Sequence, residues 1–219
     1  MGKTEKSRTS LASWRNGRVV LLFLLVLGLF CGAGWTFLNK GLYLLPGKMC
    51  EGTLERDMVK SVLPSARSAD SGSDSQGAGD GLAFWCHVTT SDDSSLSGEA
   101  RVQPTSREKW LAYYRGSGGK NRIIRVSVGA IEALAQVDSG ADTASVYVPC
   151  APPSVPSYNA SQPYAVVGEA RIHGTARATG VPLRQTLTDF AYQLAQHAYK
   201  LAECKDPRAF PEELPRYAG

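Results

Sequence analysis

The segment from Asp138 to Thr143 holds the residues whose types and spacing come closest to a catalytic arrangement. It reads Asp-Ser-Gly-Ala-Asp-Thr and runs into an apolar segment with the alternation of a strand. A turn of this kind can present the Asp138 carboxylate beside a strand, and two carboxylates that share one proton can activate a water molecule. If Asp138 is one such carboxylate, a homodimer would supply the second.

The turn at Asp138, Ser139 and Gly140 resembles the active-site turn of retroviral-type aspartic peptidases. The resemblance implies a peptidase that uses Asp138 as its catalytic carboxylate. That family also has a Gly-rich flap, followed much later by an apolar-apolar-Gly segment. Here the segment 166–168 (Val-Val-Gly) follows Asp138 by only 28 residues, with no flap-like sequence between them. Because Asp, Ser and Gly are common in turns between strands, a structural turn is the simpler interpretation.

A second pattern, Ser106-Arg107-Glu108-Lys109, is similar to the S-x-x-K motif of penicillin-binding enzymes, in which Lys activates Ser. The S-D-N and K-T-G motifs of that family are absent from residues 50–219. Thr105 and Glu108 have the spacing of a capping box, so the start of a helix explains this segment better. The sequence leaves enzymatic activity undecided and favours a noncatalytic protein, with no cofactor.

Four cysteines lie beyond the apolar N-terminal run: Cys50, Cys86, Cys150 and Cys204. None belongs to a C-x-x-C pair and none has a His at ligand spacing, so we expect no metal site. An even number of cysteines outside the cytoplasm predicts two disulfides, and three connectivities are open. We favour Cys50–Cys86 with Cys150–Cys204, because each bond would fasten a helix to a strand within one half of the domain.

Residues 19–38 form an uncharged apolar run of 20 residues, long enough as a helix to cross a membrane. Five basic residues precede it and two follow closely, which favours a cytoplasmic N-terminus. We therefore expect a cytoplasmic segment 1–18, a single transmembrane helix 19–38, a linker 39–49 and an extracellular domain 50–219. A cleaved signal peptide is the alternative, and it delivers the domain to the same side.

The charge distribution excludes a nucleic-acid partner. Residues 1–48 carry seven Lys or Arg residues against one acidic residue, which leaves 17 basic and 19 acidic residues in 49–219. The basic excess therefore belongs to the segment that flanks the membrane. A nucleic-acid site would need its basic patch on the folded domain.

The periodicity of residues 50–219 predicts an α+β domain with a mostly antiparallel sheet of about five strands and three packed helices. The polar segment 64–81 is expected to be a flexible loop. The expected strands are 82–90, 95–103, 122–128, 143–150 and 164–174. The expected helices are 50–63, 106–116 and 183–204.

An internal repeat raises the question of two similar halves. Gly-Glu-Ala-Arg-Val at 98–102 returns as Gly-Glu-Ala-Arg-Ile at 168–172. Each copy follows a strand that contains or ends at a cysteine, and each precedes a helix. Duplication and coincidence explain the match about equally well.

These features together resemble uncharacterised single-pass cell-envelope proteins of high-GC Gram-positive (actinobacterial) bacteria. The resemblance rests on the basic start, the apolar run, the cysteine beyond it, Val148-Pro149-Cys150 and Ala202-Glu203-Cys204, and it implies no activity. The expected function is a noncatalytic binding or interaction protein of the cell envelope. Its expected partners are the membrane and an envelope protein or wall component.

Overall fold

A computed structural model describes residues 20–29, 41–116, 121–137, 142–155, 157 and 161–218. The chain divides into two units, Met1–Lys40 and Gly41–Gly219. In the first unit, residues 20–29 are helical with exposed apolar side chains. Within the described ranges, no helix combines the length and the apolar character needed to cross a membrane. The predicted span 19–38 extends on both sides into residues outside those ranges.

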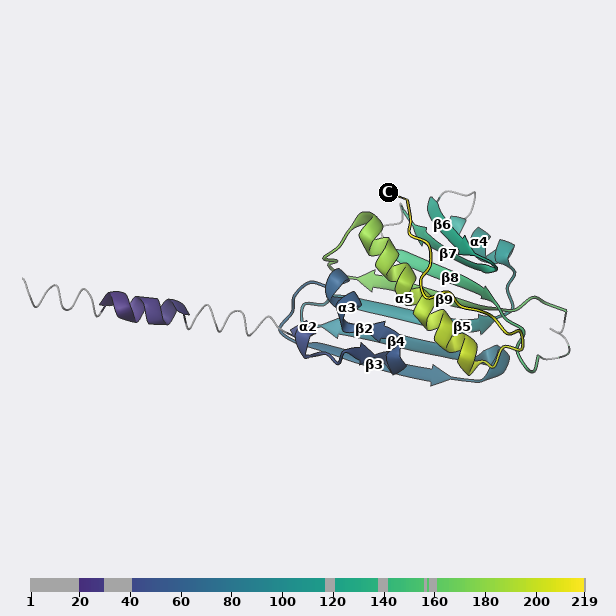
Figure 1. Cartoon of the computed structure of the whole chain (residues 1–219), viewed down its shortest axis with the longest axis horizontal. Coiled ribbons are helices and arrows are strands. Elements are labelled where there is room, and N and C mark those ends of the chain that lie inside the picture. The colour runs from purple at the N-terminus through teal and green to yellow at the C-terminus, as the bar shows by residue number, and fades with distance from the viewer. Residues whose placement is uncertain are drawn as a thin grey trace, which may run out of the picture. The chain divides into compact units, whose positions relative to one another are not determined.

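The second unit is an α+β domain built on one antiparallel sheet of seven strands, in the order β3-β4-β5-β9-β8-β7-β6 (Figure 1). The strands are β3 (Ala69–Gln76), β4 (Ala83–Thr90), β5 (Ser95–Gln103), β6 (Ile123–Val128), β7 (Ile131–Gln136), β8 (Thr143–Pro149) and β9 (Ala165–His173). The helices are α2 (Gly41–Leu44), α3 (Arg56–Val62), α4 (Arg107–Arg115) and α5 (Gly180–Leu201), with short 3-10 turns η1 (Cys50–Gly52) and η2 (Gly79–Gly81). Two further short strands, β1 (Lys48–Met49) and β2 (Leu54–Glu55), pair with each other.

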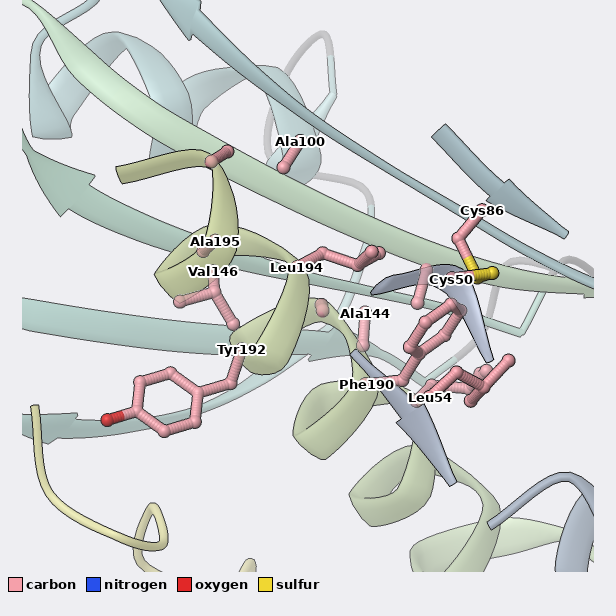
Figure 2. Packing of buried hydrophobic residues seen from close by; sticks show 14 of the residues in the cluster. Cys50, Leu54, Cys86, Ala100, Ala144, Val146, Phe190, Tyr192, Leu194 and Ala195 are labelled. Carbon is pink, nitrogen blue, oxygen red and sulfur yellow. A yellow bond between two sulfur atoms is a disulfide. The ribbon is translucent and has the colours of Figure 1, made fainter. Parts of the chain in front are cut away.

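The long helix α5 crosses one face of the sheet and forms the main core with it (Figure 1). Figure 2 shows Phe190 and Leu194 directed from α5 into this core, whereas Tyr192 points away from them. The hydroxyl of Tyr192 donates to the carbonyl of Pro211, 2.7 Å away, in the C-terminal segment 205–218. Tyr217 in the same segment is buried, with its hydroxyl 2.9 Å from that of Thr188. The C-terminal segment therefore covers the outer side of α5.

Helix α4 packs on the opposite face of the sheet. Its contacts form a separate buried cluster, composed of Trp110, Leu111, Tyr114, Leu134, Tyr147, Ala165 and Val167. Tyr147 and Val167 alternate along their strands with Val146 and Val166, which belong to the α5 core. Because successive side chains of a strand point to opposite faces, α4 and α5 lie on opposite sides of the sheet.

Both favoured disulfides are present. Cys50 is bonded to Cys86 across 36 residues, and Cys150 is bonded to Cys204 across 54 residues. The first bond joins the segment before α3 to β4, and the second joins the end of β8 to the residues after α5. Both belong to the α5 side of the sheet, where all but the partly buried Cys204 are core residues.

The structure corrects the prediction of a flexible loop at 64–81. Residues Ala69–Gln76 form the edge strand β3, which pairs with β4 over all eight of its residues. Its residues are mostly exposed Ser, Asp and Gly, so the sequence has no apolar pattern that would indicate a strand. Main-chain hydrogen bonds to β4 hold it regardless of side-chain type, and polar residues are typical of a sheet edge.

The helix predicted for 50–63 is also corrected. Cys50 and Glu51 have positive φ angles of 51° and 55°, and the main chain turns back so that Met49 pairs with Leu54. Only Arg56–Val62 is α-helical. The folded unit begins at Gly41 and not at Cys50, because Leu42, Leu45 and Met49 of the expected linker are buried in the core.

Candidate functional site

A groove of about 490 Å³ lies between α4 and the central strand pair β5 and β9. Strand residues form its floor and α4 forms its wall. Its lining consists of Glu99, Arg101, Gln103, Thr105, Lys109, Trp110, Tyr113, Tyr114, Val167, Glu169 and Arg171. The volume is within the range of small-ligand sites in proteins.

The internal repeat forms this floor. Strands β5 and β9 pair antiparallel with Glu99 directly opposite Glu169, so the two copies of Gly-Glu-Ala-Arg lie side by side in opposite directions. Strand alternation sends the Glu and Arg side chains of both copies to the groove and the Gly and Ala residues to the α5 face. The repeat therefore produces an approximately two-fold arrangement of charges, although the helices that follow the two copies lie on opposite faces.

The glycine of each copy allows α5 to approach the sheet. A Cβ atom at Gly168 would lie 2.4 Å from the carbonyl oxygen of Ala191, and a Cβ atom at Gly98 would lie 2.3 Å from a methyl group of Leu194. Both positions are too close for any larger residue without movement of the helix or its side chains. One face of the repeat therefore serves packing, and the other is free to carry charge.

Each Glu of the floor is ion-paired within its own strand. The guanidinium of Arg101 donates to Glu99, and that of Arg171 donates to Glu169. Interaction with Glu99 raises the pKa of Arg101. Like charges directly opposite each other destabilise a strand pair, so the juxtaposition of Glu99 and Glu169 is not explained by stability alone.

Tyr114 anchors one of these carboxylates to the wall. Its hydroxyl donates to Oε2 of Glu169 at 2.5 Å. Burial, followed by the charge of Glu169, raises the pKa of Tyr114 well above its ordinary value. The phenol therefore stays protonated and holds Glu169 as an oriented acceptor.

Local sequence fixes the position of α4. Ser106 is its N-cap, and its side chain accepts a hydrogen bond from the backbone nitrogen of Lys109, whereas the capping-box spacing predicts Thr105. The indole of Trp110 donates to Ser145 at 2.9 Å, and the hydroxyl of Ser145 donates to the carbonyl of Gly168 at 3.0 Å. A polar chain thus links the wall to the floor.

A buried carboxylate also holds the N-terminal end of α4. Glu132 on β7 is 4% exposed and accepts from Arg107 of α4 and from Arg125 of β6. Two cations compensate the burial of one carboxylate, so this is a structural clamp. It secures the wall of the groove without taking part in it.

The groove presents both hydrogen-bond donors and acceptors around three cations and two carboxylates. After the two Glu–Arg pairs are formed, the ammonium group of Lys109 has no ion-pair partner in the described part of the chain. Tyr113, at the rim, has 76% of its surface exposed. Nothing in the described ranges gathers three or more His, Cys, Asp or Glu residues as a metal site would require.

The residues singled out from sequence have different outcomes. Asp138, Ser139 and Gly140 lie outside the described residues, so the peptidase hypothesis is neither supported nor tested. Ser106 serves as a helix cap, and only Lys109 of the S-x-x-K pattern reaches the groove. Sequence reasoning found the repeat but missed it as a site. Its signal was the period-two alternation of small residues with Glu and Arg.

Comparison of the chain with protein-family models, with curated proteins and with solved structures finds no match.

Proposed function

We propose that this chain is a membrane-anchored extracytoplasmic protein that binds a component of the cell envelope, without catalysis, through the groove between α4 and the β5–β9 pair. The uncharged run 19–38 and its basic flanks support the anchor. The two disulfides support exposure of the domain to an oxidising compartment. The sequence resemblance supports a high-GC Gram-positive envelope.

The observation that carries the binding role is the pair of Glu–Arg dyads at the centre of the sheet. Four charged side chains lie on adjacent strands, with two carboxylates directly opposite each other. An arrangement that faces a groove and that stability alone does not explain is typical of a functional site. Each carboxylate is engaged by a guanidinium, which suits recognition of a polar ligand better than proton transfer.

Two measurements test this proposal. In intact cells, a tag behind Gly219 should be accessible to an added protease and a tag before Met1 should not. A C-terminal tag that is protected in intact cells and cleaved after lysis would contradict the extracytoplasmic location.

The second measurement is cosedimentation of the full-length chain, in mild detergent, with a cell-wall preparation from a high-GC Gram-positive bacterium. Glu169→Gln and Arg171→Gln should each weaken binding at least tenfold, because each breaks a dyad. Lys200→Gln, on an exposed residue at the end of α5, is the matched control. Equal binding by all variants would remove the groove from the function. Asp138→Asn should leave binding unchanged, and loss of a peptidase activity in that variant would favour the alternative.

A further inference from the structure

We propose that the ligand of this groove is an acidic oligosaccharide, an inference that rests on the proposed binding function. The groove combines a single unpaired positive charge, paired planar donors and acceptors, and aromatic side chains on its α4 side, with one further aromatic residue beyond the lining on the other side. No one of these features is sufficient alone. Their combination matches a chain of sugar rings that carry hydroxyl and carboxylate groups.

The charge balance selects an anionic ligand. Arg101 and Arg171 neutralise Glu99 and Glu169. The lining therefore has one net positive charge, which is that of Lys109. Among the described residues, no carboxylate pairs with Lys109. A ligand carboxylate beside Lys109 would gain a charge-assisted hydrogen bond without displacing an existing ion pair.

The hydrogen-bonding groups of the floor suit hydroxyls. The main-chain groups of β5 and β9 are already paired in the ladder, so the floor cannot bind a peptide by strand addition. Recognition must use side chains, and the floor alternates carboxylate acceptors with guanidinium donors. A sugar hydroxyl is both donor and acceptor, and so can satisfy each dyad without breaking it.

Aromatic side chains lie on both sides of the dyads. Tyr113 is exposed on the α4 side, where its ring lies 5.0 Å from that of Tyr114 at a near-perpendicular angle of 88°. On the other side, Trp85 of β4 pairs with Glu99 and therefore shares its face of the sheet, beyond the groove lining. Flat aromatic surfaces can pack against the C–H faces of sugar rings while the rings' hydroxyls remain free for polar contacts.

The spacing of the dyads indicates more than one sugar unit. Arg101 and Arg171 lie two residues from their Glu partners in opposite directions, because the strands are antiparallel. At about 3.3 Å per residue, the main-chain positions of Arg101 and Arg171 are roughly 13 Å apart along the strands, and each guanidinium reaches back to its own Glu. A floor of this length has room for more than one sugar ring, so an extended oligosaccharide can lie along it.

The test uses the full-length chain in mild detergent and measures binding by calorimetry. The probes are oligogalacturonides and hyaluronan oligosaccharides. The comparison ligands are the fully methyl-esterified oligogalacturonides, which lack the charge, and poly-L-glutamate, which has the charge without sugar rings. We expect binding of at least one acidic probe and at least tenfold weaker binding of both comparison ligands.

Variants locate the site. Lys109→Gln should weaken binding at least tenfold but leave the weak affinity for the esterified sugar unchanged. Tyr113→Ala should weaken both sugars equally, and Lys200→Gln should affect neither. Lys109 and Tyr113 are surface residues, so these variants should fold, which their far-ultraviolet circular dichroism would check.

The failures are distinguishable. If both acidic sugars fail to bind, or if poly-L-glutamate binds as tightly, the ligand class is wrong. Wall binding that still depends on Glu169 and Arg171 would then leave the proposed function intact. Loss of that dependence as well would overturn both proposals.

Discussion

The two faces of the β5–β9 strand pair differ sharply although the same repeat builds both. On the α5 face, Gly98, Ala100, Gly168 and Ala170 are buried against a helix that leaves no room for a methyl group at either glycine. On the groove face, the alternate residues are Glu and Arg, and Glu99 and Glu169 are 26% and 21% exposed. The α5 face holds the domain together, whereas the groove face carries charges that contribute little to stability.

Removal of a disulfide should give the largest effect, because both disulfides join elements on the α5 side. Replacing Cys150 and Cys204 together by Ala opens a loop of 54 residues and should lower the free energy of unfolding by about 4 kcal/mol. Removing Cys50 and Cys86, separated by 36 residues, should cost nearly the same. Urea denaturation measures both. A loss below about 1 kcal/mol would mean that the unfolded chain is not restrained as the loop-closure account assumes.

Adding a methyl group where the sheet contacts α5 should give the second-largest loss of stability. Gly168→Ala places a Cβ atom against the backbone oxygen of Ala191, which cannot move without the helix, and should destabilise the domain by about 2–3 kcal/mol. Gly47→Ala is the control, since nothing lies within 4 Å of its added Cβ atom. Thermal unfolding with the disulfides intact compares the two. Equal melting temperatures would show that α5 is less tightly seated than the structure indicates.

High pH should lower the unfolding free energy of the domain, because a buried tyrosine on each side of the sheet would have to ionise. Burial raises the pKa of Tyr217 from 10.0 to about 12, and burial with Glu169 raises that of Tyr114. A tyrosine whose pKa is raised in the folded state contributes to the unfolding free energy below pH 10, and this contribution is lost as the pH rises toward the folded-state pKa. For Tyr217, the loss should be about 2–3 kcal/mol by pH 12. Tyr217→Phe should flatten the fall in unfolding free energy between pH 10 and pH 12. An unchanged slope would exclude Tyr217 as its source.

The smallest effect should come from the groove itself. Glu99→Gln removes the ion pair with Arg101 but also the repulsion from Glu169, so the unfolding free energy should change by less than about 0.5 kcal/mol. Binding to the wall preparation should nevertheless fall. A large loss of stability in this variant would assign Glu99 a structural role and would remove the contrast between the two faces.

The local features of the fold were predictable from sequence. The apolar stripe of α5 and the alternation in β4 and β5 arise from neighbouring residues and standard periodicities, and the capping pattern predicted the start of α4 to within one residue. Strand β3 was not predicted, because main-chain hydrogen bonds hold this edge strand. Its Ser, Asp and Gly residues give no side-chain pattern from which the strand could be recognised. The left-handed backbone at Cys50 and Glu51 was missed because non-glycine residues rarely adopt it.

The candidate site was less predictable than the fold. Asp138 attracted attention because it sits in a familiar short motif, whereas Glu99 and Glu169 are 70 residues apart in sequence and neither forms a motif alone. Only the pairing register sets them opposite each other. Tyr114 gains its role in the same way, since its contact with Glu169 joins residues 55 positions apart.

By itself, the sequence of this protein determined the apolar N-terminal run, the cysteines available for two disulfides, and the two-faced character of each copy of the repeat, because these depend on residue type and short-range periodicity. The tertiary structure decided which strands became neighbours, on which face each helix packed, and therefore that one face of the repeated segments was sealed while the other formed a charged groove. These choices depend on contacts between distant segments, and local residue patterns do not encode them individually.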